Sequence, residues 1–192
     1  MKGRVLIIAG SDCSGGAGIQ ADIKSVTALG GYAATAITAL TVQNTTGVFD
    51  VLGVSPEMIV HQATVTIDDI GADAIKTGML HSVPVIEAVA EFIKLKCSGI
   101  PIIIDPVMVS QSGSRLLQED AVEALITHMI PLATVLTPNI PEAEVLSGMN
   151  ISSEGDMIAA AHKIGELGAE AVLIKGGHAE GDKIVDILWR RD

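Results

Sequence analysis

Positive charge is scarce in this chain of 192 residues: 12 lysine and arginine residues stand against 23 aspartate and glutamate residues, a formal net charge of −11. Such a chain would repel nucleic acid and anionic membrane surfaces, so we expect neither as a partner. The apolar run in "MKGRVLIIAG" is too short for a signal peptide, and a glycine-rich turn follows it instead of a cleavage site. No stretch approaches the length that spans a bilayer, and we expect a cytoplasmic protein.

Cysteine and aromatic residues are also rare. Cys13 and Cys97 lie far apart and form no Cys-x-x-Cys pair, which favours two free thiols in a reducing compartment. Aromatic residues make up 2% of the chain and hydrophobic residues 48%, a composition typical of an α/β protein with aliphatic strands. A chain of this length is expected to form one domain, residues 1–192, without a metal or disulfide to keep it folded.

Short apolar runs alternate along the chain with amphipathic stretches of helical spacing. The predicted strands cover residues 4–10, 33–43, 73–79, 100–109, 133–139, 169–177 and 183–190. Strands that are apolar throughout, each followed by a helix, imply parallel pairing with helices on both faces. The pattern therefore predicts an α/β fold, a three-layer αβα sandwich around a mostly parallel sheet.

Polar residues stand where these strands end. The ends are Gly10-Ser11-Asp12, Gln43-Asn44, Lys76-Thr77-Gly78, Asp105-Pro106, Thr137-Pro138-Asn139 and Lys175-Gly176-Gly177-His178. Any one of them could be an ordinary turn, because these residue types favour turns. In a parallel sheet, however, all six lie at one edge, where such folds bind ligands. Together they predict a crevice that holds an acid, an amide and two lysines.

This set of residues suits phosphoryl transfer, which needs positioning, a divalent metal and cations that offset phosphate charge. Magnesium takes one or two carboxylates and keeps several waters, and Asp105 and Glu142 could supply them. Simpler roles remain open for both: Asp105 precedes a proline in a turn, and Glu142 could lie in the first turn of a helix, where acids suit the dipole.

The glycine-rich stretch "GSDCSGGAGIQADI", which follows the first strand, fits neither standard phosphate-binding loop. It has no lysine in the Walker A register, and Ala21 stands where the dinucleotide pattern needs its third glycine. Its glycines still permit positive φ and close backbone approach. The stretch is therefore either a wall of a pocket or a tight turn that leads into a helix. A nucleophilic role for Cys13 is not favoured, since no histidine lies near it in sequence.

Six segments resemble those of bacterial hydroxymethylpyrimidine and phosphomethylpyrimidine kinases, members of the ribokinase-like superfamily. They are "AGSDCSGGAGIQADIKS", "ALTVQNTTGV", "IKTGML", "IIDPVMVSQSG", "LTPNIPEAEVLSG" and "VLIKGGH", in the family's order over essentially the whole chain. The first and fifth are highly specific, whereas related vitamin kinases share "DPV" and "KGGH". The resemblance implies phosphorylation of 4-amino-5-hydroxymethyl-2-methylpyrimidine and then of its monophosphate, with ATP and Mg²⁺, on the route to thiamine.

The resemblance also implies a role for individual residues. Substrate-binding positions are Gly10, Asp22, Gln43, Met79 and Val107; the magnesium and phosphate side comprises Asp105, Asn139 and Glu142; Lys175 approaches the ATP phosphates as the expected catalytic cation. The Gln43 amide would pair with the amino group and ring nitrogen of the pyrimidine, because it offers a donor and an acceptor side by side. Met79 could equally be an ordinary core residue.

In the family that the sequence resembles, a Gly-Thr-Gly-Cys (or Asp) turn forms the anion hole with its amides and supplies the catalytic base with its last residue. This motif does not occur in the sequence. Three interpretations are therefore open: the chain is a fragment, a partner chain supplies the missing part, or the chain binds a pyrimidine without phosphorylating it. Pyridoxal kinase is the alternative enzyme, since its substrate is also a ring with a hydroxymethyl group. A homodimer is expected from the resemblance.

Overall fold

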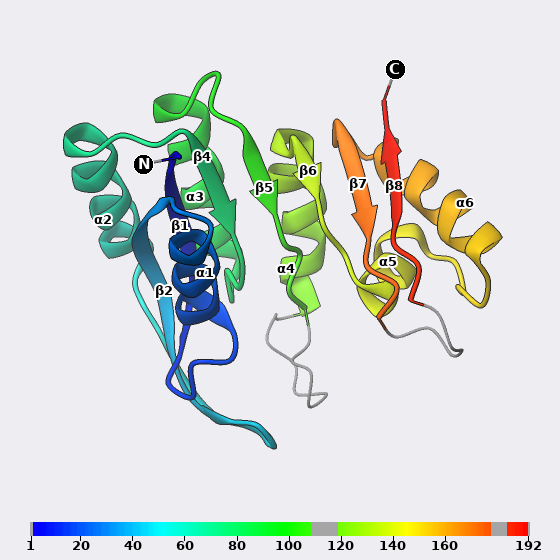
Figure 1. Cartoon of the computed structure of the whole chain (residues 1–192), viewed down its shortest axis with the longest axis horizontal. Helices are drawn as coiled ribbons and strands as arrows, with labels where there is room; N and C mark the ends of the chain where they lie inside the picture. Colours follow the sequence, from blue (N-terminus) through cyan, green and yellow to red (C-terminus); the bar gives the residue numbers. More distant parts are fainter. Residues whose placement is uncertain (1, 109–118, 178–183, 192) are drawn as a thin grey trace.

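A computed structural model describes residues 2–108, 119–177 and 184–191. Its eight strands form one sheet in the order β3-β2-β1-β4-β5-β6-β7-β8 (Figure 1). The strands are β1 (Arg4–Asp12), β2 (Tyr32–Asn44), β3 (Gly47–Gly53), β4 (Ala74–Thr77), β5 (Ile102–Ile104), β6 (Val135–Leu136), β7 (Ala171–Ile174) and β8 (Ile187–Arg190). Six neighbouring strands pair in parallel: β2, β1, β4, β5, β6 and β7. The antiparallel strands β3 and β8 form the two edges of the sheet.

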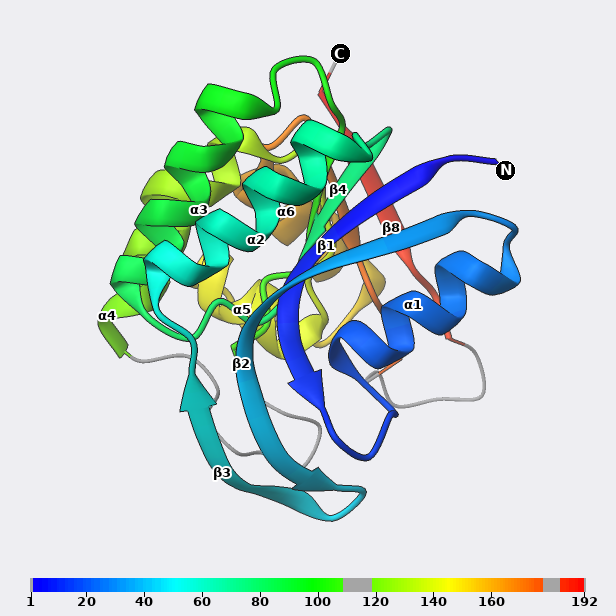
Figure 2. The same ribbon diagram turned by 90° about the vertical axis from the view of Figure 1, so that its left-hand side faces the viewer.

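Helices cover both faces of the sheet, as the alternating pattern predicts (Figure 2). They are α1 (Gly18–Ala28), α2 (Pro56–Asp69), α3 (Val83–Lys96), α4 (Glu119–Ala124), α5 (Ile140–Ser147) and α6 (Glu154–Gly165); a π-helical stretch (Leu125–Met129) and a 3-10 turn (Ile130–Leu132) continue α4. Helix α1 lies on one face, and α2 to α6 lie on the other.

The handedness of the connections explains this division of the helices. From β1 the chain moves to β2 in one direction along the sheet, whereas β4 lies on the opposite side of β1. Right-handed crossovers that run in opposite directions place their helices on opposite faces. The reversal of direction beside β1 is also the point at which open α/β sheets form a ligand crevice.

Alternate residues of the strands separate two apolar clusters. In β1, Leu6 and Ile8 belong to the large cluster beneath α2 to α6, and Ile7 and Ala9 pack with Ile19 of α1. All five side chains are at most 6% exposed. The period of two therefore buries both faces of β1, as its continuous apolar sequence predicts.

Two features differ from the predicted elements. Strand β3 was not predicted, and it pairs with β2 as a hairpin that exposes the large side chains of Leu40, Val42, Phe49 and Leu52. Within residues 100–108, the described part of the strand predicted over residues 100–109, the regular strand is Ile102–Ile104, because Pro106 has no backbone N–H to donate to a neighbouring strand. Within the described part of the chain, no helix has both the length and the apolar character needed to cross a membrane.

Candidate active site

The polar strand ends meet at one cavity of about 350 Å³ at the carboxyl edge of the sheet. Its wall includes Gly10, Thr41, Gln43, Lys76, Met79, Asp105, Val107, Asn139, Glu142 and Lys175, together with much of the glycine-rich loop. These residues come from the ends of β1, β2, β4, β5 and β7 and from the start of α5. The predicted crevice is therefore present, and its size suits a small-molecule ligand.

Asp12 organises the glycine-rich loop. Its Oδ1 accepts hydrogen bonds from the backbone N and Oγ of Ser14, at 2.8 and 2.7 Å, and its Oδ2 accepts from the backbone N of Gly16 and of Ala17, at 3.0 and 2.8 Å. The side chain is only 3% exposed. Burial alone would raise the pKa of Asp12, but the hydrogen bonds from Ser14, Ala17 and Gly16 outweigh it and hold the pKa below its ordinary value. The loop thus wraps around a buried carboxylate.

Gly18 is required at the point where this loop enters α1. Its φ is +55°, and a Cβ at this position would collide with the carbonyl oxygen of Gly10. Gly10 itself lies against the side chain of Met79, whose Sδ would stand 3.3 Å from an added Cβ. The loop therefore packs tightly on β1 and on the residues that follow β4. It forms a wall of the cavity as well as a turn into α1.

Gln43 lies at the end of β2, in the cavity wall. The Thr41 hydroxyl is 3.2 Å from Gln43 Oε1 and 3.0 Å from the carbonyl oxygen of Ser11. The backbone of Gln43 makes two hydrogen bonds with the thiol of Cys13. The side chain of Gln43 thus contacts Thr41, and its backbone is bonded to Cys13 in the loop that follows β1.

Met79 and Val107 form an apolar part of the wall. Met79 is 7% exposed, and the buried Thr38 hydroxyl donates to its carbonyl oxygen at 2.6 Å. The two readings of Met79 are compatible, because the side chain belongs to the core and also faces the cavity.

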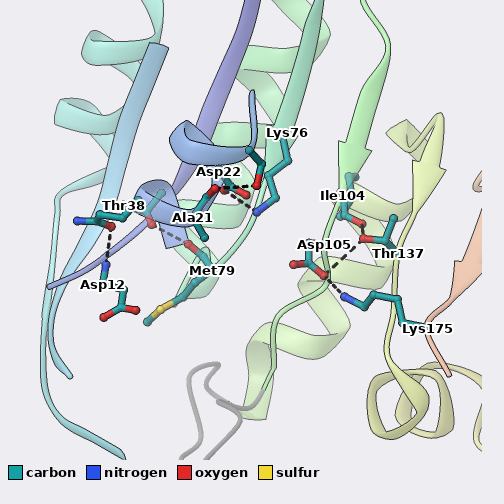
Figure 3. Close-up of polar contacts among 12 residues, drawn as sticks. Asp12, Ala21, Asp22, Thr38, Lys76, Met79, Ile104, Asp105, Thr137 and Lys175 are labelled. Atoms are coloured by element: carbon teal, nitrogen blue, oxygen red, sulfur yellow. Dashed lines mark hydrogen bonds and ion pairs between the residues drawn. The ribbon is translucent and has the colours of Figure 1, made fainter. Parts of the chain in front are cut away.

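Asp22 is not a lining residue, although it was predicted to be one. It lies on α1, and its Oδ2 is 2.7 Å from Nζ of Lys76, which does line the cavity (Figure 3). Both side chains are 22% exposed. Asp22 therefore offsets the charge of Lys76 and restrains its side chain from a position on α1 outside the cavity wall.

Asp105 and Lys175 form a second ion pair at the other end of the cavity (Figure 3). Lys175 Nζ is 2.9 Å from Asp105 Oδ1, and the Thr137 hydroxyl is 3.4 Å from the same oxygen. Lys175 follows β7 and pairs in parallel with Asn139 in an isolated bridge, which places these residues side by side. The ion pair with Asp105 holds the cation at the sheet edge, although the Lys175 side chain is 41% exposed.

Asn139 and Glu142 form a capping box at the start of α5. The Asn139 side chain accepts from the Glu142 backbone N, and the Glu142 carboxylate accepts from the Asn139 backbone N, both at 2.9 Å. Glu142 is 5% exposed. Burial raises the pKa of this carboxyl, and the charge of Asp105 raises it further against the opposing effect of Lys175. Glu142 thus combines the helix-capping role with a place in the cavity wall.

Asp105 and Glu142 are chemically suitable as ligands of Mg²⁺. They are two carboxylates in one wall, and their mutual repulsion would be relieved by a divalent cation. The described residues contain no cluster of three or more histidine, cysteine, aspartate or glutamate side chains that could hold a metal. Two carboxylates nevertheless suffice for Mg²⁺, which draws its other ligands from water and substrate phosphates.

Of the nine residues predicted for the site, all except Asp22 line this cavity, and their individual roles stay predictions. The organising role of Asp12 was not predicted. An aspartate two residues before a Ser-Gly-Gly stretch, as in Asp12-Cys13-Ser14-Gly15-Gly16, is a signal for such a turn. His178, the last polar residue of the sixth predicted strand end, lies outside the described residues.

Comparisons with known proteins agree with this geometry. A family model described as phosphomethylpyrimidine kinase matches residues 12–192. A thiamine biosynthesis bifunctional protein of Geobacter sulfurreducens is 47% identical over 98% of the chain, and the chain spans 38% of that protein. A hydroxymethylpyrimidine/phosphomethylpyrimidine kinase of Rhizobium meliloti is 45% identical over 100% of the chain, which spans 72% of that kinase.

Solved structures show the same relationship. A phosphomethylpyrimidine kinase from Clostridium difficile superposes with a TM-score of 0.90 at 45% identity, over 98% of this chain and 81% of that one. A pyridoxal kinase of Bacillus subtilis in complex with ADP superposes with a TM-score of 0.87 at 42% identity, over 97% of this chain and 70% of that one. The fold is that of ribokinase-like vitamin kinases, as expected from the sequence.

Proposed function

Because the chain belongs to the phosphomethylpyrimidine kinase family, we propose that it transfers the γ-phosphoryl group of ATP to 4-amino-5-hydroxymethyl-2-methylpyrimidine and to its monophosphate, in thiamine biosynthesis. The observation that supports this most strongly is the composition of the cavity described above, which carries the Gln43 amide at one end and the ion-paired Lys175 at the other. An aminopyrimidine and a phosphate group need these two chemistries.

The pyrimidine would bind at the end formed by β1, β2 and β4. Gln43 offers an amide to the amino group and ring nitrogen, while Met79 and Val107 supply apolar surface for the ring. Gly10 leaves room for Met79 beside β1, because a larger residue would push against its sulfur. Asp22 acts at one remove, through its ion pair with Lys76.

The phosphates would bind at the other end, near Asp105, Asn139 and Lys175. Lys175 would offset charge on the transferred phosphoryl group as the hydroxymethyl oxygen bonds to phosphorus, the bond to ADP breaks and the hydroxyl proton is released to solvent. Asp105 and Glu142 would hold Mg²⁺, which when bound neutralises phosphate charge. In this arrangement Asp105 serves both the metal and the lysine, since it already accepts from Lys175.

Pyridoxal kinase is the second candidate, because a pyridoxal kinase of Bacillus subtilis is 42% identical to this chain over 70% of its own length and has a closely similar fold. The amide of Gln43 favours the pyrimidine, because an aminopyrimidine edge presents a donor beside an acceptor. Binding of a pyrimidine without phosphorylation is the third candidate, since the chain spans only part of its relatives.

The sheet is continuous from β3 to β8, which supports a single domain over residues 1–192. The predicted homodimer and cytoplasmic location stay predictions.

The test is ATP turnover by this chain with magnesium, with the pyrimidine and pyridoxal supplied in parallel. Turnover with the pyrimidine, lost in Gln43→Ala, supports the proposal. Turnover with pyridoxal alone promotes the second candidate. Absence of turnover combined with Gln43-dependent binding of the pyrimidine supports the third.

A further inference from the structure

Cys13 is joined to the backbone of Gln43 by two hydrogen bonds but is not itself a residue of the cavity wall. Its Sγ donates to the Gln43 carbonyl oxygen at 3.1 Å and accepts from the Gln43 backbone N at 3.3 Å. Thirty residues separate the two positions in sequence. Both distances lie within the range of hydrogen bonds to sulfur, and a thiol can act both as a weak donor and as a weak acceptor.

These bonds occur where β2 has lost its pairing with β1 but is still paired with β3. The parallel pairing of β1 with β2 ends at Asp12 opposite Thr41. On the other side, the pairing of β2 with β3 is irregular between Val42 and Gln43. The Gln43 backbone thus extends beyond its last partner in β1, and the thiol of Cys13 takes up both its N–H and its carbonyl oxygen.

The side chain of Gln43 is restrained separately. The Thr41 hydroxyl, which bonds to Ser11 O, also contacts Gln43 Oε1 at 3.2 Å. Cys13 therefore fixes where the backbone of Gln43 lies, and Thr41 restrains the direction of its amide. An amide that pairs with two ligand atoms at once needs both restraints, because hydrogen bonds weaken steeply when their angles are poor.

We propose that Cys13 is a positioning residue for Gln43, which sets the affinity of the cavity for an aminopyrimidine without touching it. This inference rests on the proposed function, in which Gln43 binds the pyrimidine. A thiol suits the position because it can both donate to and accept from the backbone of Gln43.

The experiment compares Cys13→Ala, which removes both hydrogen bonds, with Cys13→Ser, which keeps a donor and an acceptor. Calorimetry measures the Kd of the hydroxymethylpyrimidine and, separately, of a non-hydrolysable ATP analogue. In Cys13→Ala we expect about three- to tenfold weaker pyrimidine binding, with unchanged affinity for the nucleotide. In Cys13→Ser we expect recovery of most of the loss.

Equal weakening of both ligands, or a serine variant as weak as the alanine variant, would show a general structural role and overturn the inference. Amide hydrogen exchange at Gln43 supplies a readout that needs no ligand. Its N–H should exchange faster in Cys13→Ala than in the wild type and in Cys13→Ser. If the wild type does not bind the pyrimidine, the proposed function fails, and the exchange rates still decide whether Cys13 holds Gln43. Equal exchange in all three proteins contradicts the inference outright.

Discussion

Lys175 Nζ lies 2.9 Å from Asp105 Oδ1, so the end of β7 is joined to the end of β5 across the intervening strand β6. Seventy residues separate the pair in sequence. The pair places a cation at one end of the cavity, while Gln43 stands in the wall at the end of β2. The two ends of the cavity therefore differ in chemistry, and each can be altered without the other.

Replacement of Lys175 by methionine should weaken nucleotide binding and turnover by about 10- to 100-fold, because a hydrogen bond from a charged group to phosphate is lost. Pyrimidine binding should change by less than about twofold. Lys163→Met is a suitable control, since Lys163 is an exposed lysine of α6. Calorimetry with the ATP analogue and with the pyrimidine checks both expectations; loss of both affinities together would refute a local role for Lys175.

The raised pKa of Glu142 should be visible in the pH dependence of the free energy of unfolding. Its pKa is raised in the folded protein, so the folded state binds more protons than the unfolded state between the ordinary and the raised pKa. The contribution of Glu142 to the free energy of unfolding is thus most favourable below the ordinary pKa and falls as pH rises through the raised value. We expect Glu142→Gln to gain stability relative to the wild type as pH increases from 4 to 7.

Urea denaturation of both proteins at several pH values measures this difference. The same variant should bind nucleotide less tightly in the presence of Mg²⁺ than the wild type, because an amide is a poorer magnesium ligand than a carboxylate. A constant stability difference across this pH range would argue that Glu142 titrates normally.

Asp12 should behave in the opposite sense. Its pKa is lowered in the folded protein, so its contribution to stability is present above the ordinary pKa of aspartate and is lost as pH falls through the lowered value. Asp12→Ala removes the acceptor of four hydrogen bonds and should cost about 2–4 kcal/mol at pH 7. The deficit should shrink near pH 2. Denaturant titrations at the two pH values compare the variant with the wild type, and a deficit independent of pH would contradict the account.

Gly18 and Gly99 provide a matched pair for the packing of the glycine-rich loop. Both have positive φ, +55° and +77°, but only at Gly18 would a Cβ meet backbone atoms, because Gly99 has nothing within 4 Å. Gly99→Ala should cost about 1 kcal/mol from backbone strain alone. Gly18→Ala should lower the free energy of unfolding by more than this and should also weaken binding of the pyrimidine, since the loop must move away from Gly10. Thermal unfolding and ligand titration of both variants test this; equal effects would mean that steric contact is unimportant.

The sequence predicts the parallel strands and the polar edge well, because each buried strand is a continuous apolar run that ends in recognisable turn residues. It does not predict β3, whose exposed side chains include Phe49 and Leu52 and which carries Asp50 within it. Such a strand has neither a buried face nor a clear alternation. Its pairing with β2 comes from the hairpin, not from a hydrophobic pattern.

Contacts between distant side chains are the other part that sequence reasoning cannot supply. Asp22 matches a pocket position by resemblance, yet it reaches Lys76 instead of the cavity, because the rotation of α1 about its axis decides where its side chains point. The capping box of Asn139 and Glu142, by contrast, is readable from their spacing of three residues.

Calorimetric binding of 4-amino-5-hydroxymethyl-2-methylpyrimidine to the wild type, to Gln43→Ala and to Lys175→Met tests whether the pyrimidine binds at the β1–β2–β4 end of the cavity. We predict measurable binding to the wild type, loss of at least about tenfold in affinity for Gln43→Ala from the unpaired edge of the ligand, and near-normal affinity for Lys175→Met. Binding that is insensitive to Gln43 would contradict the assignment of the pyrimidine to the β1–β2–β4 end of the cavity.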